Sequence, residues 1–146
     1  EANRNNYTDN VVVKLQNEGI QAHEHWKDER GVALPAQYLM ESGRLVSMKD
    51  LKFSFRLASL TPIYVWNGPN SDFERLGLAA VDKNPEKPHY GYITKGGTRY
   101  FQAIYADRAG SQACVDCHNQ HSNSPRRDFK LNDVMGGIVI SFPVGE

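Results

Sequence analysis

The chain has 146 residues and no formal net charge; 40% of its residues are hydrophobic and 23% are charged. These values are typical of a single folded domain, residues 1–146, with a real core. They exclude a disordered tail, and the scattered, balanced charges exclude a nucleic-acid-binding surface. No stretch reaches the roughly 18 consecutive apolar residues that span a bilayer. The chain begins at Glu1 with no visible signal peptide, so we expect a mature form or an excised fragment.

The first part of the chain, up to about residue 48, is predicted to be mainly helical. A helix is expected over residues 7–29, because apolar residues fall close to one of its faces; they include Val11, Leu15 and Ala22. Gly31 is a stop signal. Pro35 then opens a shorter helix that we expect to end near Ser42-Gly43.

The second part, from about residue 50, carries most of the strand signals. Residues 53–58 alternate apolar and polar side chains, which is typical of a half-buried strand. Residues 63–66 are a short apolar run, ended by a dense turn signal at residues 67–70. Ser71 then opens an S-x-x-E capping box, which predicts the start of a helix that is ended by Pro85 and Pro88.

Two further strands, at residues 89–94 and 98–105, are predicted to form a hairpin. The Lys95-Gly96-Gly97 turn between them supplies glycines where positive φ is needed. A polar loop follows, and residues 138–143 form the last predicted strand. Helices, strand, helix, hairpin, loop and strand in this order predict an α+β fold with one antiparallel sheet, in which consecutive strands are neighbours.

The most informative pattern lies in the predicted polar loop and reads Cys114-Val115-Asp116-Cys117-His118. C-x-x-C-H is the attachment signature of haem c: two thiols bond to the haem vinyl groups, and the adjacent histidine coordinates the iron. The chain has no other cysteine, so no thiol is left over. We therefore predict one covalent haem c held by Cys114, Cys117 and His118. Because this attachment takes place outside the cytoplasm, we expect a periplasmic or equivalent location.

Three other interpretations of the motif remain open. The two cysteines could form a disulfide or a redox dithiol, although their flanks lack the strand-then-helix setting of a thioredoxin-like motif. A zinc site could use Cys114, Cys117, His118 and His121, all drawn from eight residues. A pair of inert buried thiols is the simplest alternative.

The sixth iron ligand is not fixed by the motif. Side chains that could supply it are Met40, Met48, Met135, His23, His25, His89 and His121. Cations that could pair with haem propionates are Arg56, Lys95 and Arg99. No paired carboxylates, Ser/His/Asp set or Gly-rich phosphate loop is present, so we expect no enzyme activity.

Short patterns elsewhere accompany the haem motif. They are Phe55-Arg56-Leu57-Ala58-Ser59 with Pro62, Asn67 with Pro69, Asp72-Phe73-Glu74, Ser124-Pro125, Asp128-Phe129, Asp133, and Gly136-Gly137 before a strand ending at Pro143. With these patterns the chain, from roughly Gly31 onward, resembles a family of c-haem-binding PAS-like sensor domains. Such domains are periplasmic parts of bacterial chemoreceptors and histidine kinases, and sometimes free-standing proteins.

The resemblance implies a PAS-like antiparallel sheet preceded by helices, a covalent haem, and often a homodimer tethered to the membrane in the full-length protein. It also implies sensing of redox state or of a small gas such as NO or CO. Some relatives use a cysteine of the N-terminal helix as the second axial ligand, and this chain has none there. We favour Met40 instead, because it lies on a segment that the family places near the haem edge, followed by His25, water or an empty position. A soluble monohaem c-type cytochrome in electron transfer is the alternative function.

Overall fold

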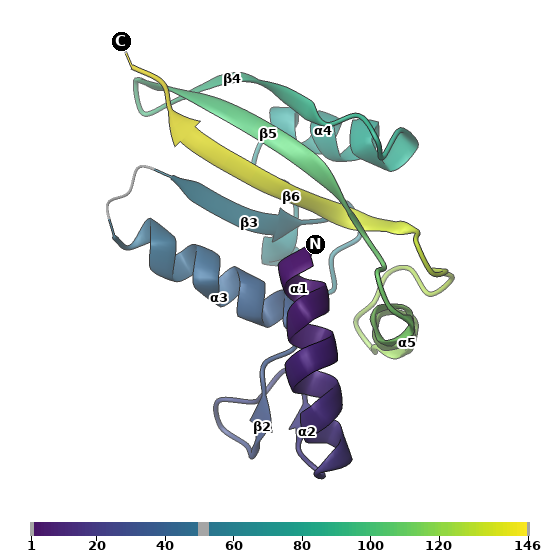
Figure 1. Cartoon of the computed structure of the whole chain (residues 1–146). Coiled ribbons are helices and arrows are strands. Elements are labelled where there is room, and N and C mark those ends of the chain that lie inside the picture. Colours follow the sequence, from purple (N-terminus) through teal and green to yellow (C-terminus); the bar gives the residue numbers. More distant parts are fainter. Residues whose placement is uncertain (1, 50–52, 146) are drawn as a thin grey trace.

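The computed structural model describes residues 2–49 and 53–145. Its elements, shown in Figure 1, are α1 (Ala2–Tyr7), η1 (Thr8–Val12), α2 (Val13–Asn17), β1 (Gln21–Ala22), β2 (Gly31–Val32), α3 (Pro35–Ser47), β3 (Ser54–Ala58), η2 (Val65–Asn67), α4 (Asp72–Lys83), β4 (His89–Lys95), β5 (Thr98–Arg108), α5 (Gln112–Gln120) and β6 (Val134–Pro143). The mixed helix and sheet composition confirms the predicted fold class.

The N-terminal helical segment ends earlier than the sequence pattern predicts. α1, the π-helical turn η1 and α2 follow one another from Ala2 to Asn17, and Gly19 then takes a positive φ of 79°. This left-handed conformation ends the helix, so the expected helix over residues 7–29 is wrong beyond Asn17. The remainder contains β1, which pairs in parallel with β2 just beyond it, and Gln21 lies opposite Gly31.

The helix α3 runs four residues past its predicted end at Gly43. Gly43 lies inside the helix because α3 packs against β3 there, and a Cβ atom at this position would lie 2.4 Å from the carbonyl oxygen of Phe55. The glycine serves close packing rather than helix termination. At the start of α3, Tyr38 stacks on Tyr7 with ring centroids 4.4 Å apart, which holds the N-terminal helices against it.

The main sheet is antiparallel, as predicted, with strand order β3-β6-β5-β4. The β4–β5 hairpin is confirmed, and Gly96 and Gly97 have φ values of 56° and 78°. β3 is not a neighbour of β4, however, because the last strand of the chain lies between β3 and β5 (Figure 1). β6 also begins earlier than the predicted Ile138, at Val134.

One face of the sheet is covered by α4. This helix begins as predicted, with Ser71 Oγ accepting a hydrogen bond from the backbone N–H of Glu74 at 3.2 Å. Its apolar side packs on the sheet to form the main core, made of Ala58, Leu78, Val81, Ile104 and Val139. The apolar run at residues 63–66 forms no strand; η2, a single 3-10 turn, covers Val65–Asn67.

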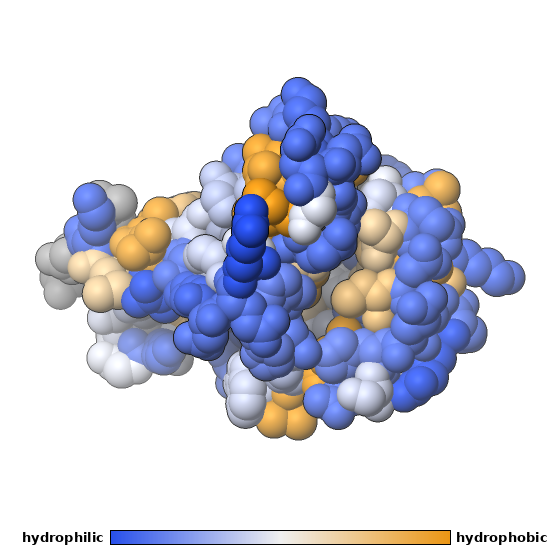
Figure 2. Space-filling view, turned by 90° about the horizontal axis from the view of Figure 1, so that it is seen from below, coloured by the Kyte–Doolittle hydropathy of each residue, from blue (hydrophilic) through white to orange (hydrophobic). Residues whose placement is uncertain are grey.

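The segment predicted as a polar loop contains the helix α5, and this prediction is therefore wrong for residues 112–120. Figure 1 shows α5 beyond the end of β5, away from α4. In the described residues, no helix combines the length and apolarity needed to cross a membrane. Figure 2 shows hydrophilic residues over most of one face of the molecule, interrupted by separate hydrophobic patches.

Candidate haem-attachment site

The helix α5 is anchored by a small apolar cluster of its own. Val115 is buried against Ala109 and Phe129, with Cys114 and Met135 packed at the side of this cluster. Backbone bonds tie the flanking segments together, since Ala109 N–H donates to the carbonyl of Asp133 at 2.9 Å. Because α5 has few apolar residues apart from Val115, it lacks the periodic signal by which a helix is recognised in sequence.

The helical conformation brings the motif residues to one side of α5. Cys117 and His118 lie three and four residues after Cys114, and side chains with this spacing are neighbours on a helix surface. Val115 points into the cluster beneath, which leaves Cys117 exposed and Cys114 half-buried. The geometry therefore places both thiols and the imidazole beside one another, as attachment to a single macrocycle requires.

His118 lies in an apolar environment with an unused polar atom. Its ring meets the ring of Phe129 edge to face, with centroids 5.7 Å apart and an interplanar angle of 89°. The Nδ1 atom is buried and has no hydrogen-bond partner among the described residues. Burial lowers the pKa of His118, and the neighbouring His121 lowers it further. The imidazole is thus kept neutral, which is the form that coordinates a metal.

The two cysteines are free thiols. Ser111 Oγ lies 3.2 Å from Cys114 Sγ, at the N-terminal end of α5. Although Cys117 reaches the surface, the protein around its sulfur raises the pKa of the thiol, and Cys114 and Glu24 add to the increase. A raised pKa leaves the thiol protonated at neutral pH, whereas a redox-active cysteine requires a lowered one.

His121 is held by a second group of side chains. Glu24 Oε2 accepts a hydrogen bond from the Tyr64 hydroxyl and lies 3.4 Å from His121 Nε2. The backbone N–H of Asn123 donates to His121 Nδ1 at 3.1 Å. Both ring nitrogens of His121 are therefore engaged. The contacts also join three distant segments at Glu24: the chain after β1, the chain before η2 and the end of α5.

The zinc interpretation finds no matching geometry. Within residues 2–49 and 53–145, no group of three or more His, Cys, Asp or Glu side chains is arranged to hold a metal ion. Cys114, Cys117, His118 and His121 therefore do not form the four-ligand site that the sequence left open.

The other candidates for the sixth ligand lie apart from one another. Met48 is 70% exposed, with its sulfur 3.1 Å from Arg44 Nη1. His25 lies beside Glu24, and the His89 ring packs on Phe73. Met135 contacts the apolar cluster below α5. His23 lies near Glu29, with 3.9 Å between Nδ1 and Oε2.

Met40, the favoured candidate, lines a cavity of about 1160 Å³ between α3, the sheet and the start of α4. Its Sδ accepts a hydrogen bond from the backbone N–H of Leu57 at 3.2 Å. His25 also lines this cavity, and the three motif residues do not. Met40 as a ligand stays a prediction, and coordination would use the sulfur lone pair that does not accept from the Leu57 amide.

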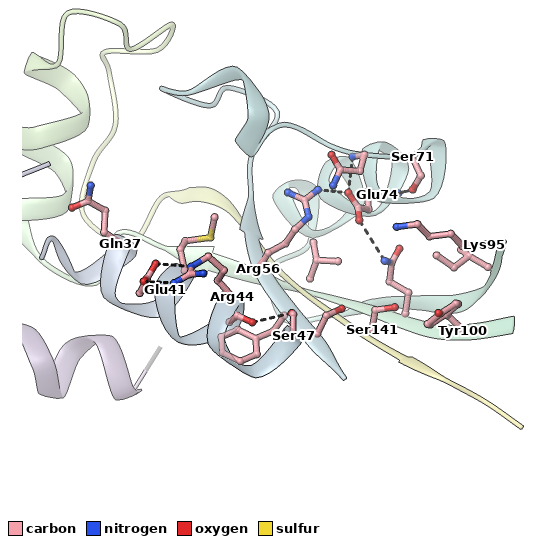
Figure 3. Close-up of a pocket in the computed structure, with 18 of the residues that line it drawn as sticks. Gln37, Glu41, Arg44, Ser47, Arg56, Ser71, Glu74, Lys95, Tyr100 and Ser141 are labelled. Atoms are coloured by element: carbon pink, nitrogen blue, oxygen red, sulfur yellow. Dashed lines mark hydrogen bonds and ion pairs between the residues drawn. The ribbon is translucent and has the colours of Figure 1, made fainter. Parts of the chain in front are cut away.

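The proposed propionate partners are also separate from α5. Arg56 and Lys95 line the same cavity, where Arg56 pairs with Glu74 (Figure 3). The Arg99 guanidinium lies 4.2 Å from the ring centre of Tyr92, on the hairpin. Their role toward propionates stays a prediction.

Two functional neighbours of the motif were not singled out from sequence. Phe129 lies between His118, whose ring is perpendicular to it, and Arg126, whose guanidinium lies 4.2 Å from the ring centre. Asn119 holds this loop to α5, because its side chain both donates to and accepts from the backbone of Phe129, at 2.9 and 3.0 Å. The patterns Asp128-Phe129 and Asp133 in the resemblance were the available signal for this loop.

Comparison with known proteins identifies the family to which the chain belongs. A search of curated proteins finds no match. Among solved structures, the crystal structure of the cyanobacterial haem-protein Tll0287 matches with a TM-score of 0.56 and 13% identity, over 98% of this chain and 92% of that chain. At this identity the likeness establishes the fold. A family model described as Tll0287-like matches residues 2–143. Because the match spans almost the entire sequence, the chain belongs to the Tll0287-like family.

Proposed function

We propose that this chain is a haem c domain, with the haem bonded to Cys114 and Cys117 and with His118 as an iron ligand. The observation that carries the proposal is the common face of α5, where two free thiols lie beside a half-buried imidazole whose Nδ1 atom is buried and unpaired among the described residues. The structural match is to a cyanobacterial haem-protein, which supports the same cofactor. In the attachment reaction each thiol S–H adds across a vinyl C=C bond, so that sulfur bonds to one carbon and hydrogen to the other. This reaction needs reduced thiols and no oxidant.

The chain's own residues would position such a group. The Val115 cluster holds α5 in place, and the perpendicular contact with Phe129 fixes the plane of the His118 ring. The surrounding apolar side chains favour neutral imidazole, since burial lowers the pKa of His118. When bound, haem iron supplies reversible one-electron chemistry and an axial position for small ligands.

We further propose that the domain is an extracytoplasmic sensor of redox state or of a small gas such as NO or CO, within a dimeric, membrane-tethered signalling protein. A ligand or redox change at the iron could change the output only if it favours one of two conformations of the protein over the other. The N-terminal helices support this role, because α1 contacts α3 and both lie outside the main sheet.

The cofactor is tested by expressing the chain with a cytochrome c maturation system and weighing the denatured protein. We expect the wild-type mass to increase by one haem. Cys114→Ala and Cys117→Ala should each hold the haem by a single thioether bond, and the protein with both substitutions should carry no covalent haem. An unmodified mass in the wild-type protein contradicts the proposal. Ferrous protein titrated with CO or NO then tests the sensor role: ligand binding that changes the dimer equilibrium supports it, whereas a spectrum unchanged at saturation favours the electron-transfer alternative.

A further inference from the structure

The cavity beside α4 contains a polar site that is separate from the haem motif. At its sheet end, side chains from four strands and one helix face a common space; they are Arg56, Glu74, Lys95, Tyr100, Gln102 and Ser141. Figure 3 shows Lys95 reaching from the end of β4 toward Glu74, above Tyr100 and Ser141 on the sheet. The cavity volume of about 1160 Å³ is large enough for a small organic molecule.

The floor of this site holds a buried acceptor with no donor. Gln102 is only 5% exposed, and its Oε1 has no hydrogen-bond partner among the described residues. The orientation of the amide is set by Glu74, whose Oε1 accepts from Gln102 Nε2 at 3.4 Å. An unpaired buried acceptor is costly. Because the Oε1 atom is covered, a donor group on a ligand in the cavity would satisfy it once the covering side chains move aside.

The charges at this end favour an anion. Glu74 is already neutralised by Arg56 and accepts a further bond from the backbone N–H of Asn70 at 2.7 Å. Lys95 is the remaining charge, and it has no ion pair among the described residues. Two cations and one anion leave an excess of one positive charge. At the opposite end of the cavity Glu41 bonds to both Arg44 and Lys27, so no comparable cation is free there.

We propose that this end of the cavity binds a small hydroxylated carboxylate, an α-hydroxy acid or a sugar acid. The ligand's hydroxyl donates to Gln102 Oε1, and its carboxylate pairs with Lys95. The hydroxyl groups of Tyr100 and Ser141, which also line the cavity, supply further donors to the carboxylate. The site lies outside the C-x-x-C-H motif, and it gives Lys95 a role other than the pairing with a haem propionate that the sequence analysis considered.

Isothermal titration calorimetry of the haem-loaded protein tests this inference with two pairs of probes. Each pair differs chiefly in its hydroxyl groups: lactate with propionate, and gluconate with hexanoate. We expect lactate or gluconate to bind, and its deoxygenated counterpart to bind at least about tenfold more weakly, because Gln102 Oε1 then stays unpaired. Absence of heat from both hydroxy acids at about 10 mM, or equal binding within each pair, overturns the proposal.

Substitutions locate the bound molecule. Lys95→Met is expected to weaken binding by about tenfold, because a charge-assisted hydrogen bond is lost. Lys83→Met is the matched control, since Lys83 is exposed on α4 and does not line the cavity, and it should bind like wild type. Ser141→Ala should weaken binding more modestly. Haem absorbance and the thermal unfolding midpoint show that each variant is folded, and equal affinities in Lys95→Met and Lys83→Met overturn the assignment.

Discussion

Arg56 on β3 and Glu74 on α4 form an ion pair that joins the edge of the sheet to the first turn of the helix covering it. The carboxylate is buried, and the guanidinium also donates to the carbonyl of Gly68 at 3.0 Å. Three segments separated in sequence therefore depend on one carboxylate: β3, the turn before α4, and α4 itself. A buried ion pair with its other hydrogen bonds satisfied specifies geometry, whereas loss of one partner leaves an uncompensated charge.

The first prediction follows from this pair. Glu74→Ala should lower the free energy of unfolding by about 3 kcal/mol, because it leaves the partly buried Arg56 without its counter-ion. Glu86→Ala is the control: Glu86 pairs with Arg108, but its side chain is 84% exposed. That change should cost less than about 1 kcal/mol. Urea unfolding measures both variants. Equal losses of unfolding free energy would show that the Arg56–Glu74 pair stabilises the fold no more than the exposed Glu86–Arg108 pair does.

The close approach of α3 to β3 gives the second prediction. Gly43→Ala places a methyl group 2.4 Å from the carbonyl oxygen of Phe55, so α3 must move away from the strand. We expect a loss of about 2 kcal/mol even though alanine is the better helix former, since backbone cannot yield as a side chain does. Gly145→Ala has no atom within 4 Å and should change nothing. A thermal unfolding midpoint for Gly43→Ala equal to that of wild type contradicts this account.

Sequence patterns predicted the elements whose signals are local. The S-x-x-E pattern at Ser71 and the Gly96-Gly97 turn each specify their own geometry, and the predicted helix start and hairpin turn are both confirmed. Gly43 and Gly19 show the limit of such patterns. One glycine continues a helix because a distant strand needs space, and the other ends a helix inside an otherwise helical pattern. Which case applies depends on tertiary packing.

The candidate site was predicted in part for a similar reason. The motif itself is a covalent signature and could be read directly from residues 114–118. Its helical setting could not, because α5 is stabilised by contacts between Val115 and residues outside the helix, Ala109 and Phe129, rather than by its own periodicity. The engagement of His121 by Glu24 joins residues 97 positions apart, which no local pattern encodes.

The loop that holds α5 gives the third prediction. Asn119→Ala removes both side-chain hydrogen bonds to the backbone of Phe129, so the end of α5 should open more often. We expect hydrogen exchange in α5 to accelerate by about tenfold or more, and the unfolding free energy to fall by about 2 kcal/mol. Asn123→Ala is the control, because the Asn123 side chain is exposed. Unchanged exchange in Asn119→Ala would mean that the apolar cluster alone fixes the helix.

The fourth prediction concerns Glu41. Hydrogen bonds from Arg44 and then Lys27 lower the pKa of this carboxyl to about 2, from an ordinary value of 4.5. A lowered folded-state pKa means that the stabilisation is fully present above pH 4.5 and is lost as the pH falls toward 2. NMR titration of wild type and Arg44→Met checks this, and the Glu41 pKa should rise toward 4.5 in the variant. A value near 4.5 in the wild type would show that the exposed pair does not form in solution.

The identity of the sixth iron ligand gives the last prediction, made on the haem-loaded protein. Met40→Leu should abolish any methionine–iron charge-transfer absorption, lower the reduction potential by on the order of 100 mV, and speed CO binding to the ferrous form. Met48→Leu is the control, because it makes the same substitution at a methionine that is 70% exposed. It should leave the absorption, the reduction potential and the rate of CO binding unchanged. The Met40 sulfur accepts from the Leu57 amide with one lone pair, and its second lone pair would be the one that binds the iron. If Met40→Leu retains the wild-type spectrum and CO rate, then Met40 remains a packing residue of α3, and His25, water or an empty position accounts for the sixth site.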